Sequence, residues 1–115
     1  MKSLSEIQSL VFQEYESNGY LKMWTDTENP NLYTQRQRLL DIAEIGLINT
    51  EVSEAMEAVR KFGYPMLLDE LGEELSDVII RVMNVASRKG ISLEPYLINK
   101  HKKNLERGKN HGKEV

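Results

Sequence analysis

The sequence contains no cysteine, which excludes disulfides, thiolate zinc sites and cysteine nucleophiles. Its seven glycines and three prolines are too few for the turns of an all-β sandwich. No apolar run approaches the roughly 18 residues of a membrane span, and the first ten residues lack the hydrophobic stretch of a signal peptide. The chain of 115 residues is 40% hydrophobic and 29% charged, as expected of one globular domain. We therefore expect a single, mostly helical, cytoplasmic domain over residues 1–115, with no membrane partner.

The charges are unevenly distributed. Residues 1–99 carry nine basic and sixteen acidic side chains, whereas residues 100–115 carry six basic and two acidic ones. A solvated basic tail is one interpretation of this asymmetry. The basic segment is too short, and the body too acidic, for us to expect a nucleic-acid partner. The two regions would fit a metal-bound polyphosphate if both face one ligand.

Helix start and stop signals predict four helices. Ser3 with Glu6 and Thr34 with Gln37 are capping-box pairs that start the first two helices. We expect the first to end at Asn18-Gly19, and residues 20–33 to form an ordered loop. The second is predicted to continue to Lys61, before the break at Gly63-Tyr64-Pro65.

The third predicted helix covers about 66–88 and stops at Lys89-Gly90. Ser92 caps a fourth helix, with Pro95 in its first turn, that reaches about Arg107. The predicted fold class is all-α. We expect a four-helix-bundle-like arrangement of two long antiparallel helices with shorter N- and C-terminal helices.

The carboxylates of the second predicted helix fall among apolar residues. At 100° per residue, several apolar side chains lie within roughly 60° of Glu51: Leu40, Leu47, Ile48, Ala55 and Ala58. An isolated buried carboxylate is costly unless a partner or a metal compensates it. Glu54 lies one turn further along the edge of this stripe, and Glu44 projects into the same arc.

The third predicted helix carries Glu74 and Asp77 on a polar strip with Glu70, Arg81, Asn84 and Arg88. Alone, this strip indicates an exposed face with local ion pairs. The short Gly-Tyr-Pro connection, however, makes the two long helices antiparallel neighbours. Glu51 lies 14 residues before Pro65 and Asp77 lies 12 after it, so the two acidic pairs fall at similar depth.

Four converging carboxylates would repel one another unless a cation neutralises them. Mg²⁺, with Mn²⁺ as a substitute, fits such oxygen ligands and also binds phosphate oxygens. A di-iron carboxylate bundle would need Glu-x-x-His pairs, and neither His101 nor His111 follows a glutamate by three. No glycine-rich phosphate loop is present.

Glu51-Val-Ser-Glu54, nineteen intervening residues and Glu74-Leu-Ser-Asp77 resemble the E-x-x-E…E-x-x-D signature of the MazG-like all-α nucleotide pyrophosphohydrolases. The stretch from Asn99 to Arg107, followed by His111-Gly112-Lys113, is similar to the basic K…N..R segment of that superfamily. The resemblance covers about residues 34–113.

The resemblance implies a helical bundle that works as a homodimer or homotetramer, with Mg²⁺ held by Glu51, Glu54, Glu74 and Asp77. The implied activity is hydrolysis of a (d)NTP between the α- and β-phosphates, which gives (d)NMP and pyrophosphate. Lys100, Asn104 and Arg107 would contact the substrate phosphates. In metal-assisted hydrolysis a carboxylate removes a proton from water, and Glu51, Glu54, Glu44 and Glu70 are all candidates.

Two residues could contact the base or sugar. Trp24 could stack on a nucleobase or pin its loop to the bundle. Asn84, like Arg81, shares the strip of Asp77 and could contact sugar or phosphate, or have a plain surface role.

Three alternative functions remain open. One is a phosphoribosyl-ATP pyrophosphatase of the same superfamily, and another is a fold that binds nucleotide and metal without turnover. The third is a non-catalytic helical interaction or regulatory bundle, which the position of Glu51 in an apolar stripe disfavours.

Overall fold

The computed structural model of the chain describes residues 1–18 and 30–114, with side chains outside 30–33 and 109–114. The elements of this part are helices: α1 (Leu4–Ser17), α3 (Pro30–Lys61), α4 (Met66–Arg88) and α5 (Leu93–Glu114). The predicted all-α fold class is therefore confirmed. No described helix has an apolar stretch long enough to cross a bilayer.

Of the two helix starts predicted from capping boxes, the first is confirmed and the second is wrong. At the start of α1, Ser3 Oγ accepts from the Glu6 amide (3.1 Å) and Glu6 Oε1 accepts from the Ser3 amide (3.3 Å), which confirms the capping box. The prediction that the second helix starts at Thr34 is wrong, because α3 begins at Pro30. Proline suits the first turn because its φ is preset and no amide is needed there. Residues 30–33 are thus helical, and the rest of the predicted loop, from 20 to 29, lies outside the described residues.

The third helix has its predicted ends, and the fourth does not. Gly90 follows α4 with a φ of +73°, a conformation that glycine adopts without steric cost, and the Ile91 amide donates to Ala86 O (2.8 Å). α5 continues past Arg107 to Glu114, so the predicted end is wrong. A glycine inside a helix costs only about 1 kcal/mol, and no proline follows Pro95, so nothing forces the helix to stop earlier.

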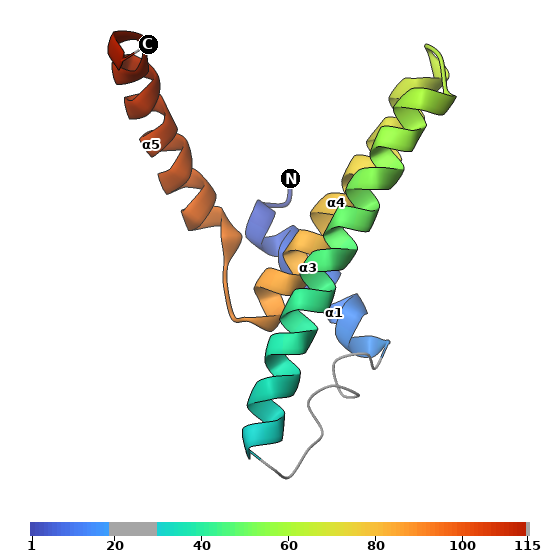
Figure 1. The fold of residues 1–115 in the computed structure, drawn as a ribbon, viewed down its shortest axis with the longest axis vertical. Coiled ribbons are helices and arrows are strands. Elements are labelled where there is room, and N and C mark those ends of the chain that lie inside the picture. Colours follow the sequence, from blue (N-terminus) through green and yellow to red (C-terminus); the bar gives the residue numbers. More distant parts are fainter. Residues whose placement is uncertain (19–29, 115) are drawn as a thin grey trace.

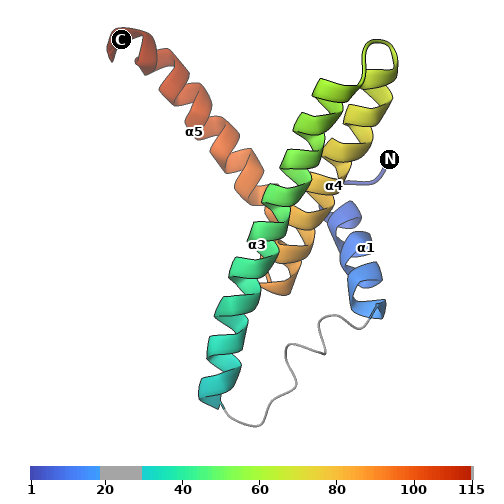
Figure 2. The same ribbon diagram turned by 45° about the vertical axis from the view of Figure 1, so that its right-hand side comes forward.

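α3 and α4 form an antiparallel hairpin, α1 packs against α4, and α5 runs away from the hairpin (Figures 1 and 2). The buried hydrophobic residues come from the hairpin: Leu40, Ala55, Ala58, Leu67, Met83 and Ala86. This places Leu40, Ala55 and Ala58 where the helical angles predicted them. Leu47, predicted in the same stripe, is 40% exposed, because no described helix covers that side of α3 as closely as α4 covers the seam.

Candidate metal centre

The seam between α3 and α4 is polar along much of its length. Two arginines of α4 cross it, since Arg81 bonds to Glu51 and Arg88 bonds to Glu44, both on α3. Because Glu44 and Glu51 are seven residues apart, they lie on the same face of α3. The seam therefore holds two groups of carboxylates, one nearer the Gly63 turn and one nearer the end of α4.

The group nearer the turn contains the predicted metal ligands. Carboxylate oxygens of Glu51, Glu74 and Asp77 lie within 4.8 Å of one another. Glu51 and Glu74 are half-buried, and Asp77 is exposed. Glu54 is exposed on the same side and acts electrostatically on Glu74. We call Glu51, Glu54, Glu74 and Asp77 the acidic cluster.

The acidic cluster disfavours its own ionisation. Desolvation raises the pKa of Glu74 above its ordinary value, and the charges of Asp77, Glu54, Glu51 and Glu70 raise it further. Among the described residues, the cation paired with the cluster is Arg81, whose Nε donates to Glu51 Oε1 at 3.1 Å. Arg81 is 44% exposed. Four carboxylates thus face one guanidinium.

This donor set fits a hard divalent cation. Such ions are bound by carboxylate oxygens that come from more than one element, and the triad supplies one oxygen from α3 and two from α4. The exposure of Asp77 leaves one side open to water or to a ligand. A bound cation would also relieve the repulsion that raises the pKa of Glu74.

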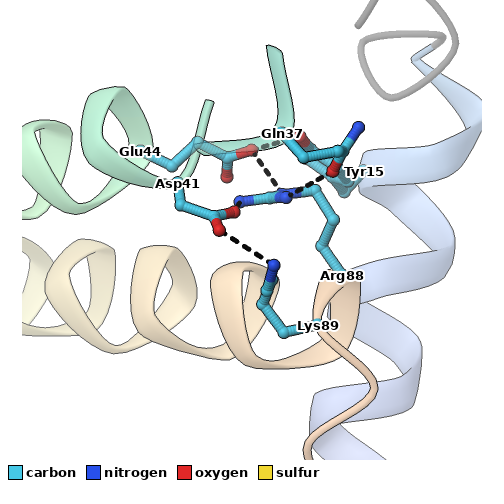
Figure 3. Close-up of polar contacts among 6 residues, drawn as sticks. All are labelled: Tyr15, Gln37, Asp41, Glu44, Arg88 and Lys89. Atoms are coloured by element: carbon cyan, nitrogen blue, oxygen red, sulfur yellow. Dashed lines mark hydrogen bonds and ion pairs between the residues drawn. The ribbon is translucent and has the colours of Figure 1, made fainter. Parts of the chain in front are cut away.

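The second group surrounds Arg88, whose side chain is only 2% exposed. Arg88 Nε donates to Glu44 Oε1 (3.0 Å), Nη1 donates to Gln37 Oε1 (3.2 Å), and Nη2 donates to Asp41 Oδ1. Lys89 Nζ adds a second cation, 2.8 Å from Asp41 Oδ2. Figure 3 shows the guanidinium enclosed by these α3 side chains. We call this group, with Tyr15, the arginine clasp.

The clasp also reaches α1 through Tyr15, whose hydroxyl donates to Glu44 Oε1 at 2.7 Å. Burial raises the pKa of Tyr15, and the hydrogen bond to Glu44 raises it further, so this hydroxyl stays protonated. Burial alone would raise the pKa of Asp41, but hydrogen bonds from Lys89 and Arg88 hold it below its ordinary value. The clasp is therefore a neutralised junction of α1, α3 and α4.

The structure shows which of the four candidate proton acceptors belong to the acidic cluster. Glu44 accepts hydrogen bonds from Tyr15 and Arg88 and is only 12% exposed, so its carboxylate serves the clasp. Glu70 lies on the polar strip of α4, half-buried, and adds to the negative charge around Glu74. Glu51 and Glu54 remain the acceptors on the α3 side of the acidic cluster.

The remaining predicted site residues are not gathered at the acids. Asn84 is half-buried on α4, and its Oδ1 is buried without a hydrogen-bond partner among the described residues. Lys100, Asn104 and Arg107 are exposed on α5, which diverges from the hairpin (Figures 1 and 2), so one chain does not bring them to the acidic cluster. Trp24 lies outside the described residues.

Sequence reasoning missed the arginine clasp. The available signal was spacing. Ile48 and Glu51 belong to a series of α3 residues spaced alternately three and four apart, and Gln37, Asp41 and Glu44 extend this series towards the N-terminus. These residues were therefore placed to face the same neighbour as Glu51. The contribution of Tyr15 had no such signal.

The comparisons with known proteins add no further information. No family model matches the chain, and no curated protein or solved structure is significantly similar to it.

Proposed function

We propose that this protein is a Mg²⁺-dependent nucleoside triphosphate pyrophosphohydrolase that cleaves (d)NTPs to (d)NMP and pyrophosphate. The observation that carries the proposal is the convergence of Glu51, Glu74 and Asp77 from two helices, within 4.8 Å and with Arg81 as their paired cation among the described residues. The MazG-like motif and its superfamily supply the reaction, and the acidic cluster supplies a site of suitable chemistry.

In this proposal Glu51, Glu74 and Asp77 hold the ion, and Glu54 stands at the open edge. When bound, Mg²⁺ would supply Lewis-acid polarisation of the phosphoryl oxygens. A cluster carboxylate that is not engaged with the ion accepts the proton of the attacking water. Glu54 is suited to this step because it is exposed and lies outside the closest triad.

Arg81 has a second role in this proposal. Its guanidinium pairs with Glu51 at 3.1 Å, and this pair would have to open for Glu51 to hold the ion. Once displaced, the side chain has five N–H donors for phosphate oxygens. The contacts from Lys100, Asn104 and Arg107 remain an expectation from the resemblance.

The test is product release from a panel of NTPs and dNTPs, with phosphoribosyl-ATP included, in Mg²⁺ and in EDTA. We expect at least one nucleotide to release monophosphate and pyrophosphate in equal amounts, and this release should require Mg²⁺. Glu74→Gln should abolish release, whereas Glu73→Gln, the adjacent exposed carboxylate outside the cluster, should retain it.

Parallel Mg²⁺ titration by calorimetry distinguishes the failures. Release from phosphoribosyl-ATP alone would replace the proposed substrate class. Mg²⁺ binding without turnover of any nucleotide would indicate a binding fold, and absence of both would favour a helical interaction protein.

A further inference from the structure

The chain exposes more surface than a compact monomer of its mass. Its accessible surface is 9005 Å², whereas the scaling for folded monomers gives about 6,500 Å² at 13.3 kDa. Its radius of gyration is 17.8 Å, against about 13 Å for a compact domain of this length. The excess area is larger than the roughly 800 Å² that each partner buries in a standard interface.

One stripe of exposed apolar side chains runs along α3. Its five members are between 41% and 68% exposed: Ile42, Ile45, Val52, Met56 and Val59. With Asn49, they alternate in steps of three and four residues, which is the spacing of a helix that packs along another helix. The stripe is nearly five turns long, and no described helix of the same chain covers it.

The stripe lies away from the acidic cluster. Met56 is two residues after Glu54, so their side chains point about 160° apart around α3. On α4, Leu75 and Leu68 have the same relation to Asp77 and Glu70, and they are 47% and 62% exposed. The hairpin therefore has an acidic edge and an apolar edge, and a partner on the apolar edge leaves the acids accessible.

We propose that the apolar edge is the contact between two copies of this chain, with their α3 helices antiparallel about a two-fold axis near residues 50 and 51. This arrangement sets Ile42 opposite Val59 of the second copy, Ile45 opposite Met56, and Asn49 opposite Val52. Each stripe position meets another stripe position, as a self-complementary two-fold interface requires.

The overall charge of the two halves of the hairpin favours the antiparallel orientation through long-range electrostatics. Residues 51–77, the half of the hairpin at the turn, carry eight acidic and two basic side chains. The opposite half, residues 34–50 and 78–89, carries two acidic and five basic ones. Antiparallel pairing places each acidic half beside the basic half of the other copy, whereas parallel pairing would place the two acidic halves together.

The inference stands on exposure, spacing and charge, and it does not depend on the proposed hydrolase activity. It specifies one face and one register for the homo-oligomer that the sequence resemblance implies. A tetramer would contain the same pair.

Engineered cysteines test the register directly, because the natural chain has none. Residues 45 and 56 are about 16 Å apart along one helix, beyond the 7 Å that a disulfide can span between Cα atoms. Ile45→Cys/Met56→Cys should therefore form covalent dimers on mild oxidation, seen on a non-reducing gel. Ile45→Cys alone should not, since antiparallel pairing separates the two copies of residue 45.

Sedimentation equilibrium completes the test. The natural chain should sediment at twice the monomer mass or a multiple of it. Ile45→Glu should raise the dissociation constant by at least about 10-fold, because it buries an unpaired charge. Ala43→Glu introduces the same charge at an exposed position away from the stripe, and it should leave the dissociation constant unchanged. A natural chain that is monomeric at micromolar concentration, or cross-linking of Ile45→Cys as efficient as that of the double variant, would overturn the proposal.

Discussion

The acidic cluster and the arginine clasp occupy the same seam and are built from the same kinds of residue, yet they differ in how their charge is neutralised. In the clasp, Asp41 and Glu44 are matched by Arg88 and Lys89, with Tyr15 as a further donor. In the cluster, four carboxylates are matched by Arg81. Carboxylates that the chain neutralises itself hold helices together, and those that it leaves in excess are available to a cation from solution.

The largest expected difference is in activity. Glu51→Gln should lower pyrophosphate release by at least about 100-fold, since it removes a ligand of the proposed metal site. The stability of the fold should change by less than about 1 kcal/mol in metal-free buffer, because the lost pair with Arg81 is partly exposed and carboxylate repulsion is relieved. Steady-state assays and urea denaturation measure both. Natural turnover in the variant would remove Glu51 from the site.

The next effect is on stability. Arg88→Ala should cost about 3 kcal/mol of unfolding free energy, because it leaves Asp41 and Glu44 partly buried without their main partner. Arg60→Ala, which removes an exposed pair with Glu57, should cost less than about 1 kcal/mol. Thermal or urea unfolding of both variants gives the comparison. If the two variants lose the same unfolding free energy, the ion pairs of Arg88 contribute no more than an exposed surface pair.

The contributions of the acidic cluster and of the arginine clasp to folding stability should change with pH in opposite directions. The pKa of Glu74 is raised above the ordinary 4.5, so its favourable contribution to folding is present below that value and is lost as pH rises through the folded pKa. The pKa of Asp41 is lowered below the ordinary 3.8, so its contribution is present above that value and is lost as pH falls through the folded pKa.

Carbon-13 NMR titration of the two carboxyls in metal-free buffer checks these signs. Glu51→Gln serves as the control, because removing that charge should lower the pKa of Glu74 and leave the pKa of Asp41 in place. An Asp41 that titrates at higher pH than Glu74 would contradict the contrast between the regions.

The smallest expected effect concerns Arg81. Arg81→Ala should tighten Mg²⁺ binding by about twofold to fivefold, the equivalent of an exposed ion pair of up to about 1 kcal/mol. Calorimetric titration of Mg²⁺ without nucleotide measures it, with Arg60→Ala as the matched loss of one positive charge. Unchanged or weaker binding would mean that the guanidinium does not compete for Glu51.

The acidic cluster could be predicted from the sequence because local rules determine it. Glu51 and Glu54, and likewise Glu74 and Asp77, are three residues apart on regular helices, and the Gly63-Tyr64-Pro65 turn fixes the pairing of those helices. The part of the clasp that Tyr15 contributes escaped prediction because Tyr15 reaches Glu44 from a third helix across 29 residues of sequence. The course of α5 escaped for the same reason, since no periodicity encodes the angle at which a helix leaves its neighbours.

That angle is held by side chains from the other end of the chain. Gln8 Nε2 donates to Ile91 O (2.7 Å) and to Ser87 Oγ (2.8 Å), and Gln8 Oε1 accepts from the Leu93 amide (3.1 Å). Ser5 donates to Glu94 at 2.8 Å. α1 is thus tied to residues that lie 79 to 89 positions later in the sequence. Contacts of such high sequence separation carry a large loop-closure entropy, so the α3–α4 hairpin can form by local contacts before α1 is fixed against it.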